Sequence, residues 1–322
     1  MNLATYKENF LNYLSEEITV KEPKNLYQPI SYILNLGGKR LRPILTLMAC
    51  ELFNGNYKNA LNASLAIEVF HNFTLMHDDI MDHAELRRGK QTVHKKWNEN
   101  TGILSGDAML IYANQLLENY DVNLYKKLMI IFNKTALEVC EGQQYDIDFE
   151  TRNDVTITEY IKMISYKTAV LVACALKMGA LIANASKTDC ENIYNFGFSL
   201  GIAFQLQDDY LDTFGNVATF GKKIGGDILE NKKTFLYLKT LELANKEDKI
   251  VLQKLFSTTE DSVTKIEKVT AFYKKYKTDN YIKNEVENYT QLAYRSLEKT
   301  TLSNESKNVF IELGDGLLDR VD

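Results

Sequence analysis

The sequence predicts an all-α protein that forms a single large domain over residues 1–322. Apolar residues recur at helical spacing, as at Leu61, Leu65 and Val69, whereas strand-like alternation bounded by turn signals is hard to find. All three prolines lie within the first 43 residues, so none interrupts the helical pattern that follows. No linker rich in Ser, Gly or Pro divides the chain, which favours one domain over two.

Composition is that of a soluble globular protein. The chain of 322 residues is 45% hydrophobic and 25% charged, and its net charge of −5 argues against a nucleic-acid partner. The four cysteines (Cys50, Cys140, Cys174 and Cys190) lack metal-ligand spacing, so we expect buried free thiols in a reducing cytoplasm.

No segment is expected to enter a membrane. Charged residues interrupt any apolar core near the N-terminus, so no signal peptide is predicted. The most apolar stretch, Ala169–Ala185, is short, rich in Ala and broken by Lys177. It predicts a buried core helix rather than a membrane span.

One acidic pattern occurs twice, as Asp78-Asp79-Ile80-Met81-Asp82 and as Asp208-Asp209-Tyr210-Leu211-Asp212. Each copy follows an apolar helical stretch. In a helix the first and last carboxylates of each copy share a face, where like charges about 5–6 Å apart repel by roughly 3 kcal/mol at an effective dielectric of ~20. No Lys or Arg lies one turn away in either helix, so we expect an external cation to neutralise them.

Hard carboxylate oxygens of this kind suit Mg²⁺, which commonly bridges one or two carboxylates to substrate phosphates. Two alternatives remain open. His77 and His83 flank the first copy and make a zinc or iron site conceivable, and each copy could also be a solvated acidic helix end. Repetition of the pattern, each time before a basic segment containing glycine, argues against the second alternative.

Basic residues gather in three segments. The run from Gly37 to Pro43 reads GGKRLRP, and residues 84–94 and 213–227 are predicted loops that carry Arg87-Arg88 and Lys222-Lys223. Clustered Lys and Arg recognise phosphate groups. No Ser-His-Asp, Cys-His or P-loop pattern accompanies them. The substrate is therefore expected to be a phosphate or diphosphate that a metal activates.

Together these motifs resemble those of the trans-isoprenyl diphosphate synthases, or polyprenyl synthetases. In chain order they are GGKRLRP, HDDIMD with LRRG, a Gly-Gln pair with a nearby acid (Gly142, Gln143, Asp146), YKT, FQLQDDYLD and GKKIGGDILENKK. The resemblance covers residues 30–235. It implies antiparallel helices around a deep cavity with both acidic motifs at its mouth, about three Mg²⁺ ions, and a homodimer.

The resemblance also implies roles for individual residues. Metal ligands would be Asp78, Asp79 and Asp82 of the first copy and Asp208 of the second, with Asp209 and Asp212 in support. The allylic diphosphate would be contacted by Arg87, Lys167 and Lys222, and isopentenyl diphosphate by Lys39, Arg42, His71 and Arg88. Thr168, Gln205 and Lys232 would line the site, while the role of Arg40 is less clear.

The reaction implied is ionisation of an allylic diphosphate, attack by isopentenyl diphosphate and loss of a proton. Phe73, five residues before Asp78, with the smaller Thr74 beside it, resembles the arrangement of short-chain synthases. It predicts a C20 product, geranylgeranyl diphosphate, with C15 farnesyl diphosphate as the alternative, unless Phe73 is only core packing. A terpene cyclase and a non-catalytic partner subunit are the rival functions. The two predicted loops would close over the site as a lid.

Overall fold

The computed structural model describes residues 2–216, 224–257 and 263–318. These residues are almost entirely helical, and the strands among them are limited to one two-stranded antiparallel hairpin. The predicted all-α class is therefore confirmed. The residues pack into two compact units, Met1–Ala136 with Cys174–Glu191 (unit 1) and Leu137–Ala173 with Asn192–Asp322 (unit 2). That residues 1–322 act as one domain stays a prediction.

The elements of unit 1 are α1 (Leu3–Glu17), α2 (Lys24–Leu34), α3 (Leu41–Leu52), the 3₁₀ turn η1 (Tyr57–Ala60), α4 (Leu61–Met81), β1 (Leu86–Arg87), β2 (Lys90–Gln91), α5 (Val93–Lys96) and α6 (Glu99–Leu117). Three helices carry residues of both units: α7 (Val122–Thr151), α9 (Val170–Ile182) and α10 (Lys187–Phe214).

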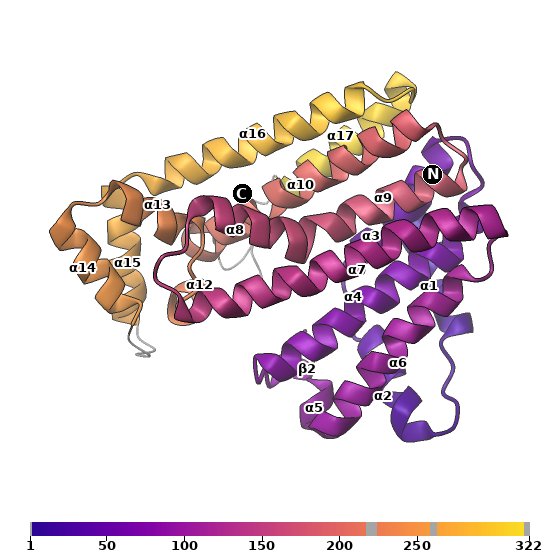
Figure 1. The fold of residues 1–322 in the computed structure, drawn as a ribbon, viewed down its shortest axis with the longest axis horizontal. Coiled ribbons are helices and arrows are strands. Elements are labelled where there is room, and N and C mark those ends of the chain that lie inside the picture. Colours follow the sequence, from indigo (N-terminus) through magenta and orange to yellow (C-terminus); the bar gives the residue numbers. More distant parts are fainter. Residues whose placement is uncertain (1, 217–223, 258–262, 319–322) are drawn as a thin grey trace. The chain divides into compact units, whose positions relative to one another are not determined.

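The remaining elements belong to unit 2. They are α8 (Ile157–Ile164), the π-helical turn η2 (Ser165–Ala169), α12 (Gly226–Leu229), α13 (Phe235–Leu243), α14 (Lys246–Leu255), α15 (Val263–Lys275), α16 (Thr278–Glu298) and α17 (Asn304–Leu318). In Figure 1 the orange helices α14 and α15 lie side by side, as do the yellow helices α16 and α17.

Helix α4 forms the centre of unit 1. It packs on α3 and α6, and most of its residues between Ala63 and Met76 are buried. Side-chain caps begin two of the helices around it: the amide N–H of Thr5 donates to Asn2, and that of Thr101 donates to Asn98, each at 2.9 Å. Such caps satisfy amides that have no partner within the helix. The acidic motif of α4 therefore ends a helix that is fixed by burial.

The core of unit 2 gathers apolar residues of α8, α10, α13 and α15, among them Tyr160, Leu206, Phe235 and Val269. The C-terminal third forms amphipathic helices: on α15, Val269 and Tyr273 are buried while Lys274 and Lys275 end the helix exposed. The second acidic motif thus also lies on a helix held by a packed core.

Some expectations need correction. Residues 84–94 are not a loop: they form the β1–β2 hairpin and the start of α5. The second predicted loop is shorter than 213–227, because α10 continues to Phe214 and α12 begins at Gly226. Cys140 is exposed on α7, whereas Cys50, Cys174 and Cys190 are buried free thiols as expected.

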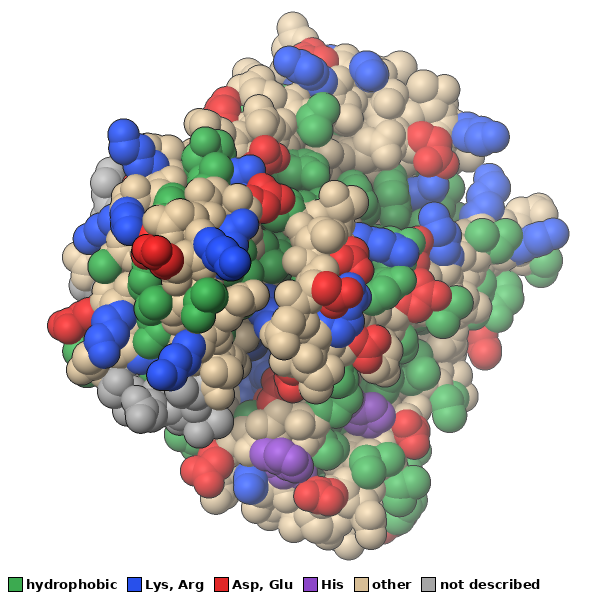
Figure 2. Space-filling model, turned by 60° about the vertical axis from the view of Figure 1, so that its left-hand side comes forward, with side chains coloured by type: hydrophobic (Ala, Val, Ile, Leu, Met, Phe, Trp, Pro, Cys, Tyr) green, Lys and Arg blue, Asp and Glu red, His purple; other side chains and the backbone are tan. Residues whose placement is uncertain are grey.

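The apolar stretch around α9 is a core helix, as predicted. Ile157–Ile182 has a mean hydropathy of 1.4 over its most apolar window and is long enough to cross a membrane, but 72% of that window is buried inside the structure. On the face drawn in Figure 2, Lys and Arg side chains are interspersed with Asp and Glu. The charge of that face is therefore mixed rather than of one sign.

Candidate active site

The first acidic motif lies at the C-terminal end of α4. Asp78 and Asp79 occupy its last turn and Asp82 is its C-cap residue. The C-terminal end of a helix carries the negative pole of its dipole, so carboxylates there are destabilising by a few tenths to ~1 kcal/mol each. Three carboxylates at this end reduce the stability of the helix, which indicates that their negative charge has a function such as binding a cation.

Part of that charge is neutralised by the hairpin. Arg87 donates from Nε to both carboxylate oxygens of Asp79 at 2.8 Å, and one of its terminal nitrogens lies 2.7 Å from Asp79 Oδ1 and 4.0 Å from Asp78 Oδ2. The hairpin turn has positive φ at Arg88 (54°) and Gly89 (74°), as in a type I′ turn. Arg87 was expected from the sequence to bind diphosphate, but its pairing with Asp79 was not predicted.

The hairpin also joins the two basic motifs of unit 1. Arg88 donates a hydrogen bond to the carbonyl oxygen of Gly37. Gly38, at φ 119°, has no side chain, and a Cβ there would lie 2.9 Å from the Arg88 guanidinium. Glycine at this position therefore lets the arginine lie against the backbone. The predicted grouping of these two motifs is present in the structure.

His71 lies within this group of arginines. A guanidinium nitrogen of Arg42 donates to His71 Nε2 at 3.3 Å. Burial, followed by the positive charge of Arg42 and Arg88, lowers the pKa of His71 well below its usual value. His71 is thus neutral at neutral pH and acts as a hydrogen-bonding group, while the arginines supply the positive charge.

Arg40 has a structural role. Its side chain is 2% exposed and forms an ion pair with Glu68, whose side chain is 3% exposed, and it also donates to the carbonyl oxygen of Leu34. An isolated buried charge would be strongly destabilising, so the two residues depend on each other. Glu68 belongs to none of the sequence motifs, so the sequence did not predict this ion pair.

Phe73 lies one to two turns before the acidic motif and is 8% exposed. Its ring centre is 5.6 Å from that of Phe70 and 4.8 Å from that of His77. His77 Nε2 in turn lies 3.2 Å from the carbonyl oxygen of Ile103 on α6. Thr74 is half-buried and donates to the carbonyl oxygen of His71 at 2.8 Å. His77 is therefore directed toward α6, which weakens the zinc or iron alternative.

The second motif, on α10 in unit 2, has its middle carboxylate buried. Asp209 is 5% exposed and accepts hydrogen bonds from the Tyr160 hydroxyl and, at 3.1 Å, from Gln205 Nε2. Burial and the nearby Asp227 raise the pKa of Asp209 well above its usual value. Asp79 and Asp209 hold the same place in their motifs, and each has a specific side-chain partner that orients it.

Asp212 organises the segment that follows. Its carboxylate accepts from the backbone N–H of Asp227 at 3.0 Å, and its carbonyl oxygen accepts from the N–H of Gly225 at 2.6 Å. Burial, then the charge of Asp212, raises the pKa of Asp227 to about 7. Asp227 therefore belongs to the acidic group of unit 2, although no motif reasoning singled it out.

The π-helical turn η2 carries Lys167 and Thr168. Lys167 Nζ lies 2.5 Å from Asp146 of α7, and the Thr168 hydroxyl donates to Gln205 Oε1 at 3.2 Å. Gly142 of α7 lies directly against η2, since a Cβ there would be 2.3 Å from the Lys167 backbone nitrogen. A π-helical turn is uncommon and often marks a functional site.

Two lysines complete the predicted set. Lys232 is half-exposed and lies 2.6 Å from Glu230 and 3.9 Å from Asp227. Burial lowers its pKa, but the charges of Asp227 and Glu230 outweigh burial and raise it. Lys39 is exposed near Arg40. Lys222 lies outside the described residues, as do residues 217–223 of the proposed second lid loop.

The carboxylates fit a hydrated divalent cation better than a closed metal cage. Within the described parts of the chain, no group of three or more His, Cys, Asp or Glu side chains is arranged to hold an ion. In unit 1 Asp82 is exposed and Asp78 is half-buried, and in unit 2 Asp208 is half-buried. Carboxylates of this kind suit Mg²⁺, which keeps several waters and shares its coordination with phosphates.

An all-α architecture, acidic motifs at helix ends and clustered Arg and Lys side chains are the features that the resemblance to the trans-isoprenyl diphosphate synthases implies. The polyprenyl synthetase family profile matches residues 23–273, and the chain belongs to this family. It is a trans-prenyltransferase.

Two relatives with the same name each match nearly the whole chain. Geranylgeranyl diphosphate synthase of Methanosarcina mazei is 36% identical over 95% of this chain and 93% of its own. The enzyme of that name from Sulfolobus acidocaldarius is 39% identical over 90% of this chain and 87% of its own. A crystal structure of geranylgeranyl pyrophosphate synthase is 50% identical, with a TM-score of 0.95 and all of both chains covered.

Proposed function

We propose that this enzyme condenses isopentenyl diphosphate with allylic diphosphates of five, ten and fifteen carbons to give geranylgeranyl diphosphate. The observation that carries the proposal is the arrangement in unit 1. There Arg87 binds Asp79 beside Asp78, and Arg42 and Arg88 gather at His71. In this proposal the carboxylates bind a metal and the cations beside them bind diphosphate, and the names of two relatives support it.

In this proposal Asp78, Asp82 and Asp208 hold Mg²⁺, with Asp79, Asp209 and Asp212 in support. Bound Mg²⁺ would supply positive charge to the leaving diphosphate. Arg87, Lys167 and Lys222 would bind the same diphosphate and stabilise its developing charge, the kind of preorganised electrostatics that contributes most in many enzymes.

Isopentenyl diphosphate would bind the basic group of unit 1, through Lys39, Arg42 and Arg88. Neutral His71 would accept from Arg42 and keep its guanidinium directed at the substrate. The departing diphosphate would take the proton that is lost, so no dedicated base is needed. Thr168, Gln205 and Lys232 would line the site. The first two are hydrogen-bonded to each other.

Product length would be limited by Phe73, whose buried ring packs on Phe70 before the acidic motif. Phe73→Ala should shift the products beyond C20, measured by chromatography of the dephosphorylated alcohols. Phe53→Ala is the matched control, because Phe53 is equally buried at 8% exposure but follows α3. If Phe73→Ala gives the wild-type product distribution, Phe73 is core packing. A C15 main product in wild type would support the farnesyl alternative.

The enzyme would act in the cytoplasm as a homodimer. Helix α6 exposes Leu104 and Ile111, each 61% exposed and seven residues apart on one face. Apolar side chains aligned in this way favour burial against a second copy. Leu104→Glu with Ile111→Glu should give monomers in sedimentation velocity, whereas Ile250→Glu, at a site 59% exposed on α14, should not. A monomeric wild-type protein contradicts this.

The decisive experiment incubates the protein with Mg²⁺, isopentenyl diphosphate and each of the C5, C10 and C15 allylic diphosphates. Elongation of at least one is expected, and elongation of none rejects the proposal. A terpene cyclase would leave the basic group at His71 without a role, because it needs no second diphosphate. If the chain were a non-catalytic subunit, elongation would be seen only after a catalytic partner protein is added.

A further inference from the structure

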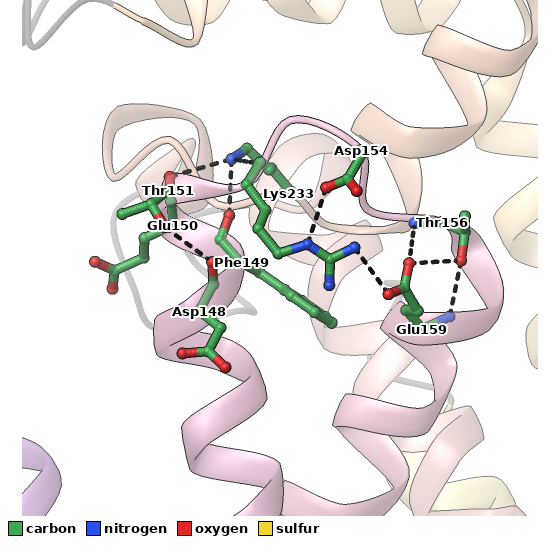
Figure 3. Close-up of polar contacts among 9 residues, drawn as sticks. Asp148, Phe149, Glu150, Thr151, Asp154, Thr156, Glu159 and Lys233 are labelled. Carbon is green, nitrogen blue, oxygen red and sulfur yellow. Dashed lines mark hydrogen bonds and ion pairs between the residues drawn. The ribbon is translucent and has the colours of Figure 1, made fainter.

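Two adjacent lysines of unit 2 lie in opposite surroundings. Lys232 is near the carboxylates of Asp227 and Glu230, at 3.9 and 2.6 Å. The next residue, Lys233, contacts no carboxylate of that group. Its Nζ donates to the carbonyl oxygens of Phe149, at 2.7 Å, and of Glu150, at 3.1 Å, and to that of Arg152 (Figure 3).

These carbonyls mark the end of α7, which stops at Thr151. The last carbonyls of a helix have no partner within it, and a cation there is favoured by the helix dipole. Lys233 therefore caps α7 from a distant part of the chain. Three hydrogen bonds from the ammonium group of Lys233 join its segment to the end of α7.

The turn after α7 is itself firmly held. Arg152 donates to Asp154 and Glu159, each at 2.9 Å. Glu159 and Thr156 form a reciprocal capping box that begins α8 (Figure 3). The end of α7 and the start of α8 therefore form one rigid corner, and Lys233 is attached to it.

Both helices of this corner lead to the candidate site. Asp146 lies on the last turns of α7, and Lys167 lies on η2, which follows α8 directly. These two residues form the 2.5 Å ion pair. Asp146 is also close enough to contribute to the raised pKa of Lys232. An attachment at Lys233 thus sets the position of Lys232 relative to Asp146 and Lys167.

A second contact holds the same segment from α15. Lys265 is 3% exposed and its Nζ donates to Asn231 Oδ1 at 2.7 Å. The side chain of Ile266 lies against Gly225, where a Cβ would be 2.7 Å away. The C-terminal region, which carries no motif of its own, therefore supports the residues on either side of Asp227.

We propose that Lys233 is a positioning residue of the prenyl transfer, which keeps Asp227 and Lys232 in place by anchoring their segment to the end of α7. This rests on the proposed function, in which Lys167 binds the diphosphate and Lys232 lines the site. Without the anchor, substrate binding must itself order the segment. We therefore expect the affinity for substrate to fall more than the rate of the chemical step.

The experiment compares steady-state kinetics of wild type, Lys233→Met, Lys233→Arg and Lys254→Met with isopentenyl diphosphate and farnesyl diphosphate. Lys254 is an exposed lysine near the same corner, on α14, and is the matched control. KM for the allylic diphosphate should rise roughly tenfold in Lys233→Met with a smaller change in kcat. Lys233→Arg, which can still donate to the carbonyls, should recover most of the loss, and Lys254→Met should match wild type.

Two further measurements separate positioning from general stability. In a Lys232→Met background, adding Lys233→Met should raise KM by clearly less than the roughly tenfold expected in the wild-type background, since one of the two residues that it positions is gone. Amide hydrogen exchange of residues 225–232 in the substrate-free protein should be faster in Lys233→Met than in Lys254→Met. If Lys233→Met does not fold, Lys233→Gln takes its place with smaller changes of the same direction.

Unchanged KM and exchange in the Lys233 variant, or fully additive effects with Lys232→Met, overturn the proposal. Absence of elongation by the wild-type enzyme would instead overturn the proposed function. In that case the exchange measurement still decides whether Lys233 anchors the segment.

Discussion

The close approach of α7 to the π-helical turn is the most direct test of how the fold positions the site. An added Cβ at Gly142 would lie 2.3 Å from the backbone nitrogen of Lys167 and 2.7 Å from the carbonyl carbon of Tyr166. Ordinary contacts begin at 3.4 Å, so Gly142→Ala forces the two backbones apart by ~1 Å. Neither backbone can rotate away as a side-chain end could.

The expected cost has two parts. Overpacking of this kind destabilises by about 1–3 kcal/mol, offset by up to ~1 kcal/mol because alanine favours the helix. Displacement of Lys167 by ~1 Å should reduce kcat/KM by about a hundredfold, because its ion pair with Asp146 spans the same contact. The loss of kcat/KM should therefore be larger than the fraction of unfolded protein accounts for.

Gly316→Ala is the matched control, because Gly316 lies in α17 with nothing within 4 Å of an added Cβ. It should leave activity unchanged and raise stability slightly. Prenyl transfer is measured with isopentenyl and farnesyl diphosphates, and stability by urea unfolding. If Gly142→Ala retains wild-type kcat/KM, the close packing of α7 on η2 does not position the site.

Three further outcomes are expected. Glu68→Ala leaves the buried charge of Arg40 unpaired and should lower the free energy of unfolding by about 3–5 kcal/mol in urea; a loss under ~1 kcal/mol contradicts the buried pair. Because the pKa of Asp227 rises to about 7 on folding from 3.8, its contribution is present at low pH and is lost as pH rises through 7. In metal-free protein, wild-type stability should therefore fall relative to Asp227→Asn between about pH 4 and 7, and parallel pH curves would refute this. Tyr160→Phe removes a donor from buried Asp209 and should cost about 1–3 kcal/mol in urea, with no loss expected if water replaces the hydroxyl.

The helices that carry the site could be predicted from sequence, because apolar spacing and the absence of proline are local properties of the chain. Helix α4 and the core helix α9 follow the predicted stretches closely. The β1–β2 hairpin could not, because its turn has Arg-Gly rather than the usual Asn-Gly or Asp-Gly pair. Its stability depends on Arg87 and Arg88, whose partners are distant in sequence.

The candidate site divides in the same way. Motif spacing identified the paired carboxylates and the basic clusters, since residue type and helical period are enough for that. It did not distinguish Asp79 from Asp78 or Asp209 from Asp208, because burial and the partners Arg87 and Tyr160 make that difference. Likewise, nothing local to Gly142 or Lys233 indicates the backbone that each one contacts.

By itself, the sequence determined an all-α prenyltransferase with acidic motifs at helix ends and cations to bind diphosphate. The fold class and the acidic and basic groups follow from periodicity, charge and residue chemistry along the chain, whereas the prenyltransferase activity follows from the resemblance of its motifs to a known family. Only the tertiary structure decided that Arg87 pairs with Asp79, that Arg40 is a core residue, and that Lys233 donates to the carbonyls at the end of α7. The physical reason is that hydrogen bonds and burial act between elements that the order of residues does not bring together.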